Sequence, residues 1–165
     1  MPAHPDIRVA PVNAALRPAL LQLAVHETQQ PFVSPIAVTL ADAELCSGSE
    51  GMAILCDGAP IGFYRIETQP GCIADRDFPR PTLGLRSFFI DARWQGRGLG
   101  TQALVALVAD LAQRHADAQD LVLTVNTRNT AGIALYRRAG FVDSGELYHG
   151  GRSGPQHLMV LALSP

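Results

Sequence analysis

One stretch of this sequence, a predicted strand followed by a glycine-rich turn and a predicted helix, constrains the fold more than any other. The apolar run Leu83–Ile90 predicts a buried strand, and Thr101–His115 carries leucine and valine at helical spacing. Gly96, Gly98 and Gly100 lie between them. Glycines allow several backbone N–H groups to converge, and the start of a helix adds a partial positive charge. The stretch therefore predicts a cradle for a phosphate or pyrophosphate.

Two common phosphate-binding loops do not fit this turn. The dinucleotide fingerprint needs G-x-G-x-x-G, with an acidic residue about 20 positions further on at the end of a second strand. Here the glycines read G-R-G-L-G, and no acidic residue stands in that place. The P-loop needs a lysine, and all 13 basic residues of this chain are arginines. The turn therefore requires another kind of anion-binding loop.

Composition predicts one compact intracellular domain over residues 1–165. Hydrophobic residues make up 47% and charged residues 17% of the chain, which suits a substantial core. The net charge of −2 argues against a nucleic-acid-binding surface. Three cysteines without a C-x-x-C spacing support neither a metal site nor a disulfide framework. No signal pattern begins the chain and no apolar run is long enough for a membrane span, so we expect a cytoplasmic protein.

The remaining patterns predict a mixed α/β arrangement. Asn13 can cap a helix that fades by Thr28, and a second short helix begins at Thr39 or Asp42. Strands are predicted at Ile7–Val12, Met52–Cys56, Pro60–Ile66, Leu83–Ile90 and Leu121–Val125, from Phe141, and at Gln156–Leu163. A strand–helix–strand unit around the glycine turn implies a parallel pair, whereas hairpins such as the one at Asp57 imply antiparallel strands. We therefore expect a mixed sheet flanked by helices.

A second motif lies downstream of the glycine turn. The segment Val125–Phe141 reads VNTRNTAGIALYRRAGF. It resembles the pattern V-N-x-x-N-x-x-A-x-x-L-Y-x-x-x-G-F of the GNAT N-acetyltransferase superfamily, with Gly132 in place of the alanine. The turn Gln95–Gly100 is similar to the Q/R-x-x-G-x-G/A acetyl-CoA loop of the same superfamily. Both motifs occur in the expected order and separation, and looser similarities point to its spermidine/diamine acetyltransferase-like branch.

The resemblance implies a GNAT-like fold that binds acetyl-CoA. This fold has about seven strands, with a splayed parallel pair at its centre, and about four helices. Acetyl-CoA would insert between the splayed strands, where the Ile90 backbone pairs with pantetheine and the Phe88 N–H polarises the thioester carbonyl. Phe88 and Ile90 also suit ordinary core positions, Arg97 a solvated surface and Asn129 a plain helix cap. The implied cofactor contacts are Phe88, Ile90, Gln95, Gly96, Arg97, Gly98, Leu99, Gly100, Thr101 and Asn129.

The resemblance also implies one catalytic residue, whereas the general base stays open. Tyr136 would lie near the CoA sulfur, where a phenol can protonate the departing thiolate as a general acid. Its alternative role is that of a packed tyrosine. Glu67 and His149 are candidate bases, although ordinary structural roles suit both. Glu27 and Glu44 can be expected to attract a cationic amine or simply to face solvent.

These interpretations predict an acyltransferase that moves an acetyl group from acetyl-CoA to a primary amine by direct attack. The acceptor is expected to be a small molecule, such as a polyamine. The alternatives are an acetyl-CoA-binding regulatory module with little activity and a protein N-terminal acetyltransferase. The apolar strand Gln156–Leu163 would be a liability at a free sheet edge, which predicts a homodimer.

Overall fold

The computed structural model describes residues 4–151 and 153–163, and these form one seven-stranded mixed sheet. The strand order is β1-β2-β3-β4-β5-β7-β6. The strands are β1 (Ile7–Pro11), β2 (Ser49–Cys56), β3 (Ala59–Glu67), β4 (Thr82–Ile90), β5 (Asp120–Asn126), β6 (Val142–Tyr148) and β7 (Gln156–Ala162). Only β4 and β5 pair in parallel among the described strands, while their neighbours pair antiparallel. The predicted mixed sheet with a central parallel pair is therefore confirmed.

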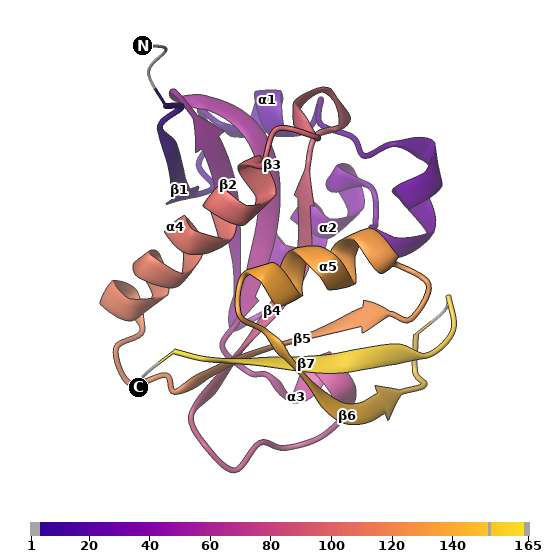
Figure 1. Cartoon of the computed structure of the whole chain (residues 1–165). Coiled ribbons are helices and arrows are strands. Elements are labelled where there is room, and N and C mark those ends of the chain that lie inside the picture. The colour runs from indigo at the N-terminus through magenta and orange to yellow at the C-terminus, as the bar shows by residue number, and fades with distance from the viewer. Residues whose placement is uncertain (1–3, 152, 164–165) are drawn as a thin grey trace.

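The parallel pair separates after a short ladder. Thr82, Leu83 and Gly84 pair with residues 120–122, and no pairing between β4 and β5 continues beyond them in the described chain. In Figure 1, β2, β3 and β4 run steeply, whereas β5 and β7 run across the view, so the two halves of the sheet diverge. On the side that faces β5, the backbone of residues 85–90 thus borders a gap instead of a neighbouring strand.

A β-bulge shapes the free part of β4. Arg65 of β3 pairs with Arg86, and Phe63 pairs with Phe89, so a single β3 residue lies opposite both Ser87 and Phe88. Ser87 has a left-handed φ of 56°, which is uncommon for a residue other than glycine. Its hydroxyl accepts a 2.8 Å hydrogen bond from the buried Thr39 hydroxyl, which supports the unusual conformation.

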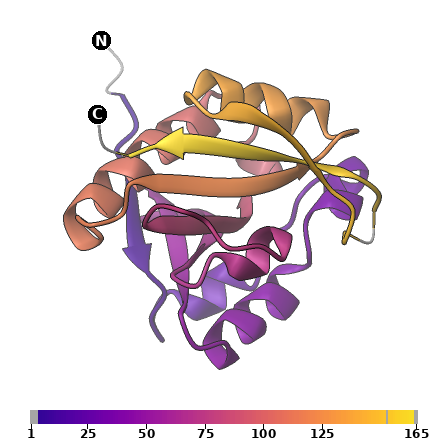
Figure 2. The same cartoon turned by 90° about the horizontal axis from the view of Figure 1, so that it is seen from below.

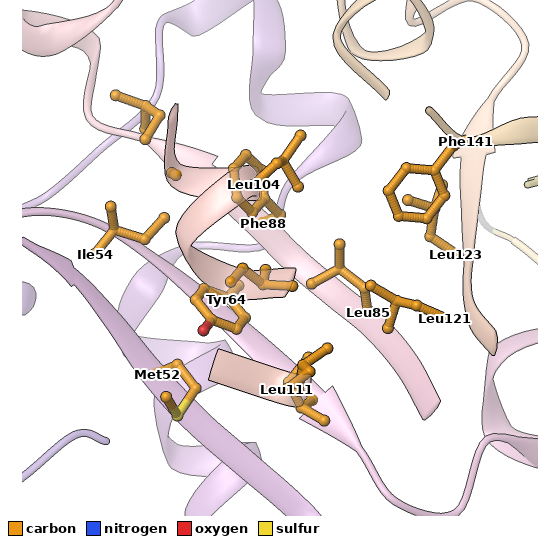
Figure 3. Packing of buried hydrophobic residues seen from close by; sticks show 14 of the residues in the cluster. Met52, Ile54, Tyr64, Leu85, Phe88, Leu104, Leu111, Leu121, Leu123 and Phe141 are labelled. Carbon is orange, nitrogen blue, oxygen red and sulfur yellow. The ribbon is translucent and has the colours of Figure 1, made fainter. Parts of the chain in front are cut away.

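Helices cover both faces of the sheet. Their bounds are α1 (Arg17–Leu20), η1 (Glu27–Phe32), α2 (Ile36–Leu45), α3 (Gly71–Ala74), η2 (Ala92–Trp94), α4 (Leu99–Arg114) and α5 (Thr130–Arg138). Figure 2 shows α4 and α5 on one side of the sheet and the violet helices of the N-terminal region on the other. Figure 3 shows apolar side chains of the core, among them Leu104 of α4, Leu121 of β5 and Phe141, which follows α5. No helix of the described residues is long and apolar enough to cross a membrane.

The first helical region differs from its prediction. Asn13 does accept a hydrogen bond from the Leu16 N–H, but α1 ends at Leu20 instead of continuing toward Thr28. Beyond α1, the Ala24 N–H donates to the Asp91 carboxylate at 2.9 Å, and this tertiary contact takes a donor that a longer helix would use. The second helix begins at residue 36, earlier than predicted, directly after Pro35, whose extended backbone at the N-cap (ψ 144°) lies outside the helix.

The proposed edge strand lies inside the sheet. β7 pairs with β5 on one side and with β6 on the other, so the free edge belongs to β6. The apolar character of β7 is explained by burial between these neighbours. The reason given for a homodimer is therefore wrong, and the homodimer itself stays a prediction.

Candidate active site

Two cavities open where β4 and β5 diverge. The smaller one, about 300 Å³, lies among the end of β4, the glycine turn, the start of α4 and α5, and we call it the cofactor cavity. The larger one, about 550 Å³, lies among η1, the free parts of β4 and β5 and the β6–β7 connection, and we call it the acceptor cavity. The cavities share five lining residues, Phe32, Val33, Phe88, Asn129 and Tyr136. A wider hollow of about 950 Å³ at the opposite end of β4 contains none of the predicted site residues.

Nearly all predicted cofactor contacts line the cofactor cavity. These are Phe88, Ile90, Gln95, Gly96, Gly98, Leu99, Gly100, Thr101 and Asn129. Gly98 is the N-cap of α4 with φ 74°, and a Cβ atom placed there would meet no protein atom within 4 Å. Arg97 does not line the cavity. Its guanidinium lies over the Trp94 ring at 5.1 Å and donates to the Arg93 carbonyl. The loop thus offers a glycine backbone that borders open space.

The Ile90 backbone faces the cleft. The Asp91 N–H donates to the Ile61 carbonyl of β3. In an antiparallel pair, residues alternately point their N–H and C=O toward the partner strand and away from it. The N–H and C=O of Ile90, the preceding residue, therefore point away from β3. The Ile90 carbonyl already accepts a 2.7 Å hydrogen bond from the Gln95 side chain. Gln95 also exchanges two amide hydrogen bonds with Gln29 of η1. Gln95 therefore ties β4 to η1 in this structure, and the Ile90 N–H is the group left facing the cleft.

Asp91 anchors the start of the glycine turn. Its buried carboxylate accepts hydrogen bonds from the Ala24 N–H at 2.9 Å and from the Arg93 N–H and side chain at 3.1 and 2.8 Å. Burial disfavours the charged form, but these donors outweigh it and hold the pKa of Asp91 below its usual range. The carboxylate therefore joins the segment after α1 to the turn that begins the cofactor cavity.

We expect Asp91→Asn to lower the free energy of unfolding by about 2 kcal/mol at pH 7, because it weakens hydrogen bonds to a buried charge. A depressed pKa stabilises the fold above the unfolded-state pKa of about 3.9 and loses this effect as pH falls through the folded value. The difference between wild type and variant should thus shrink below about pH 4. Urea unfolding at pH 7 and pH 3 measures it, with the exposed Asp117→Asn as control. A pH-independent difference would contradict the charge-based account.

Helix α5 carries Tyr136 to the junction of the two cavities. The helix begins at Asn129, whose side chain accepts from the Gly132 N–H at 3.0 Å, so the predicted cap is confirmed. A Cβ on Gly132 would lie 2.6 Å from the Asn129 amide nitrogen, so a larger residue there would require the Asn129 side chain to shift. The half-buried Tyr136 ring packs edge-on against Phe88 and Phe141, at centroid distances of 6.2 and 5.7 Å. Burial raises the pKa of Tyr136 above its ordinary value, which keeps the phenol protonated.

The candidate bases lie away from this junction. Glu67 lines neither cavity and is 4% exposed. Its carboxylate lies 3.1 Å from Arg65 and 3.5 Å from Arg86, and it accepts from the Ser49 hydroxyl. Glu67 is therefore a buried ion-pair partner, which agrees with the structural alternative given for it. His149 is exposed and also lines neither cavity.

The structure adds residues that sequence reasoning missed. Arg138 lines the cofactor cavity and follows Tyr136 by two positions in the second motif, so that motif contained its signal. Gln29 and the neighbouring η1 residues reach both cavities, but nothing local in the sequence indicates this. Arg86 lines the acceptor cavity from the middle of β4. It is the one charged residue of this largely apolar strand, and that charge was the available signal.

Comparison with known proteins agrees with this geometry. The family model described as "Acetyltransferase (GNAT) family" matches residues 18–141. The spermine/spermidine N(1)-acetyltransferase of Bacillus subtilis (strain 168) is 32% identical over 86% of this chain and 91% of its own. An aminoglycoside acetyltransferase solved with coenzyme A shares the fold with a TM-score of 0.75, 18% identity and 95% coverage of both chains. A spermidine N-acetyltransferase from Vibrio cholerae, solved with CoA and spermine, has a TM-score of 0.68, 13% identity and 95% coverage of both chains.

This chain belongs to the GNAT acetyltransferase family, and the enzyme is an acyltransferase of the N-acetyltransferase type. The seven-stranded sheet with its diverging parallel pair is the fold of these relatives. The resemblance seen in the two sequence motifs is thus confirmed.

Proposed function

We propose that this enzyme transfers the acetyl group of acetyl-CoA to the primary amine of a small molecule by direct attack. The observation that carries the proposal is the junction of the two cavities at Phe88 and Tyr136. A cofactor that enters from the glycine turn and an amine that enters from the other side would meet there. The acetyl-CoA relationship is further supported by the coenzyme A bound in similar folds.

The cofactor cavity suits the chemistry of acetyl-CoA. The N–H groups at the start of α4 and the open space over Gly98 suit a pyrophosphate, since a helix N-terminus favours anions. Arg138, and Arg97 beside the turn, add positive charge for the phosphates. The Ile90 N–H faces the cleft, where it would bond the pantetheine arm as a neighbouring strand does.

The proposed reaction has one chemical step. The neutral amine attacks the thioester carbonyl carbon, a C–N bond forms, and the C–S bond breaks. The amine loses a proton, and the departing thiolate gains one, so the products are an N-acetyl amine and CoA. The protonated phenol of Tyr136 is assigned to the thiolate as general acid. Glu67 could accept the amine proton only through a chain of other groups, because Arg86 lies between its carboxylate and the acceptor cavity.

Two measurements test the proposal. Acetyl-CoA should raise the melting temperature of the protein by mass action, and CoA should be released when a small amine is added. Mass spectrometry of the product should show one added acetyl group. Binding without CoA release from any small amine would favour a regulatory acetyl-CoA-binding module, and activity on peptide N-termini alone would favour a protein acetyltransferase.

A further inference from the structure

The acceptor cavity has an unexpected charge for an enzyme whose relatives are named for polyamines. Among the described residues that line it, Arg86 is the one charged side chain. The remaining polar lining is neutral and consists of amides and hydroxyls such as Gln30, Asn126 and Tyr148. Moving a polycation from water into such a site costs free energy that carboxylates would have to offset.

The charge partner of Arg86 lies behind it. Glu67 is almost fully buried and is shared with Arg65, which lies closer to it at 3.1 Å. The contact from Arg86 to Glu67 is 3.5 Å long, at the limit of a hydrogen bond. The Arg86 side chain is 40% exposed and has five N–H donors, so donors remain for a ligand. The cation, not the carboxylate, thus faces the cavity.

The surroundings of the cavity do not reverse this polarity. Arg128 donates to the Ser153 carbonyl at 2.7 Å and lies over the Phe32 ring, and it has no carboxylate partner among the described residues. At the other side, Asp75 accepts a 3.2 Å hydrogen bond from the Tyr148 hydroxyl but does not line the cavity. Asp42, on the side of α2, accepts a 2.7 Å hydrogen bond from Arg65 and does not line the cavity either. Asp75, which is bonded to a lining residue, is therefore the carboxylate to test for a competing cationic ligand.

Arg86 lies close to the junction of the cavities. Two positions along β4 separate it from Phe88, which is at most about 7 Å of strand. Resting on the proposed acetyl transfer, we propose that the acceptor is a small primary amine that also carries a carboxylate, and that Arg86 binds this carboxylate while the amine reaches the thioester. A guanidinium binds a carboxylate through two parallel hydrogen bonds, which also orients the ligand. Amino acids have this combination of groups.

The test compares acceptors with and without a carboxylate. Lysine is paired with 1,5-diaminopentane and arginine with agmatine, and a third pair, phosphoethanolamine with ethanolamine, offers a phosphate in place of the carboxylate. We expect kcat/KM to be at least about tenfold higher for lysine than for 1,5-diaminopentane and for arginine than for agmatine, as a charged hydrogen bond allows. A preference for the diamine or for agmatine, or for phosphoethanolamine over both amino acids, would overturn the proposal. No CoA release with any acceptor would instead refute the proposed function itself.

Variants separate binding from folding. Arg86→Gln should reduce the ratio of kcat/KM between lysine and 1,5-diaminopentane by about 10- to 100-fold, whereas a purely structural role would lower both values together. Arg80→Gln is the matched control, because Arg80 also pairs with one carboxylate, Asp120, but lies outside the acceptor cavity. An unchanged ratio in Arg86→Gln would overturn the assignment of Arg86. A loss of diamine activity alone in Asp75→Asn would show that a cationic acceptor uses this site.

Discussion

Replacing Tyr136 by phenylalanine is expected to lower kcat by roughly 10²–10⁴, the usual worth of general acid–base help. The phenol lies at the junction of the two cavities, and the ring packs against Phe88 and Phe141 without needing the hydroxyl. Fold and acetyl-CoA affinity should therefore persist. Because free thiols ionise near pH 8.5, the thiolate is a fair leaving group, and the loss should fall at the low end of this range.

The pH profile gives an independent check on this role. Burial keeps the Tyr136 pKa above its ordinary value of about 10, so wild-type kcat should not fall through loss of this proton below that pH. Tyr64→Phe is the matched control. Tyr64 is also a buried tyrosine with a raised pKa, but it lines neither cavity. The kcat of the Tyr64→Phe variant should therefore stay within about twofold of the wild-type value. An unchanged kcat in Tyr136→Phe, with chemistry limiting the rate, would rule out the acid role.

Gly98→Val is expected to weaken acetyl-CoA binding by more than about 100-fold, since blocking two charge-assisted hydrogen bonds costs roughly 3 kcal/mol. The valine side chain would occupy the open space over the turn, where we place the pyrophosphate. The left-handed backbone of Gly98, with φ 74°, also disfavours a β-branched residue. Isothermal titration calorimetry and thermal shift with acetyl-CoA measure the loss.

Gly145→Val separates the two effects of this change. Gly145 has a left-handed φ of 85°, and a Cβ there would also meet no protein atom within 4 Å, but it lies on β6 outside the cofactor cavity. Both variants should lose about 1–2 kcal/mol of stability through backbone strain. Acetyl-CoA affinity should fall in Gly98→Val alone. Equal affinity in both variants would contradict the assignment of the phosphate site to this turn.

The assembly of the acceptor cavity depends on contacts that no local pattern reveals. The Ser153 hydroxyl donates to the Pro31 carbonyl at 2.8 Å and so joins the β6–β7 connection to η1 across 122 positions of sequence. The burial of Glu67 and the exposure of Arg86 depend on the β3–β4 register and on Arg65, which the strand patterns leave open. The charge of the acceptor cavity was for this reason absent from the sequence-based prediction.

The sequence by itself determined the elements whose conformation is local. The glycine turn before α4, the Asn129 cap and the strands follow from backbone preferences, capping groups and the spacing of apolar residues, which neighbours in the chain supply. Tertiary structure decided where α1 ends, because Asp91 takes the Ala24 N–H across 67 positions, and that β7 lies inside the sheet. Tertiary structure also decided that the cation of Arg86, and not the carboxylate of Glu67, faces the acceptor cavity. Such features depend on contacts between segments that are distant in the sequence. The free energy of these contacts is gained only when the sheet assembles, so no local pattern reveals it.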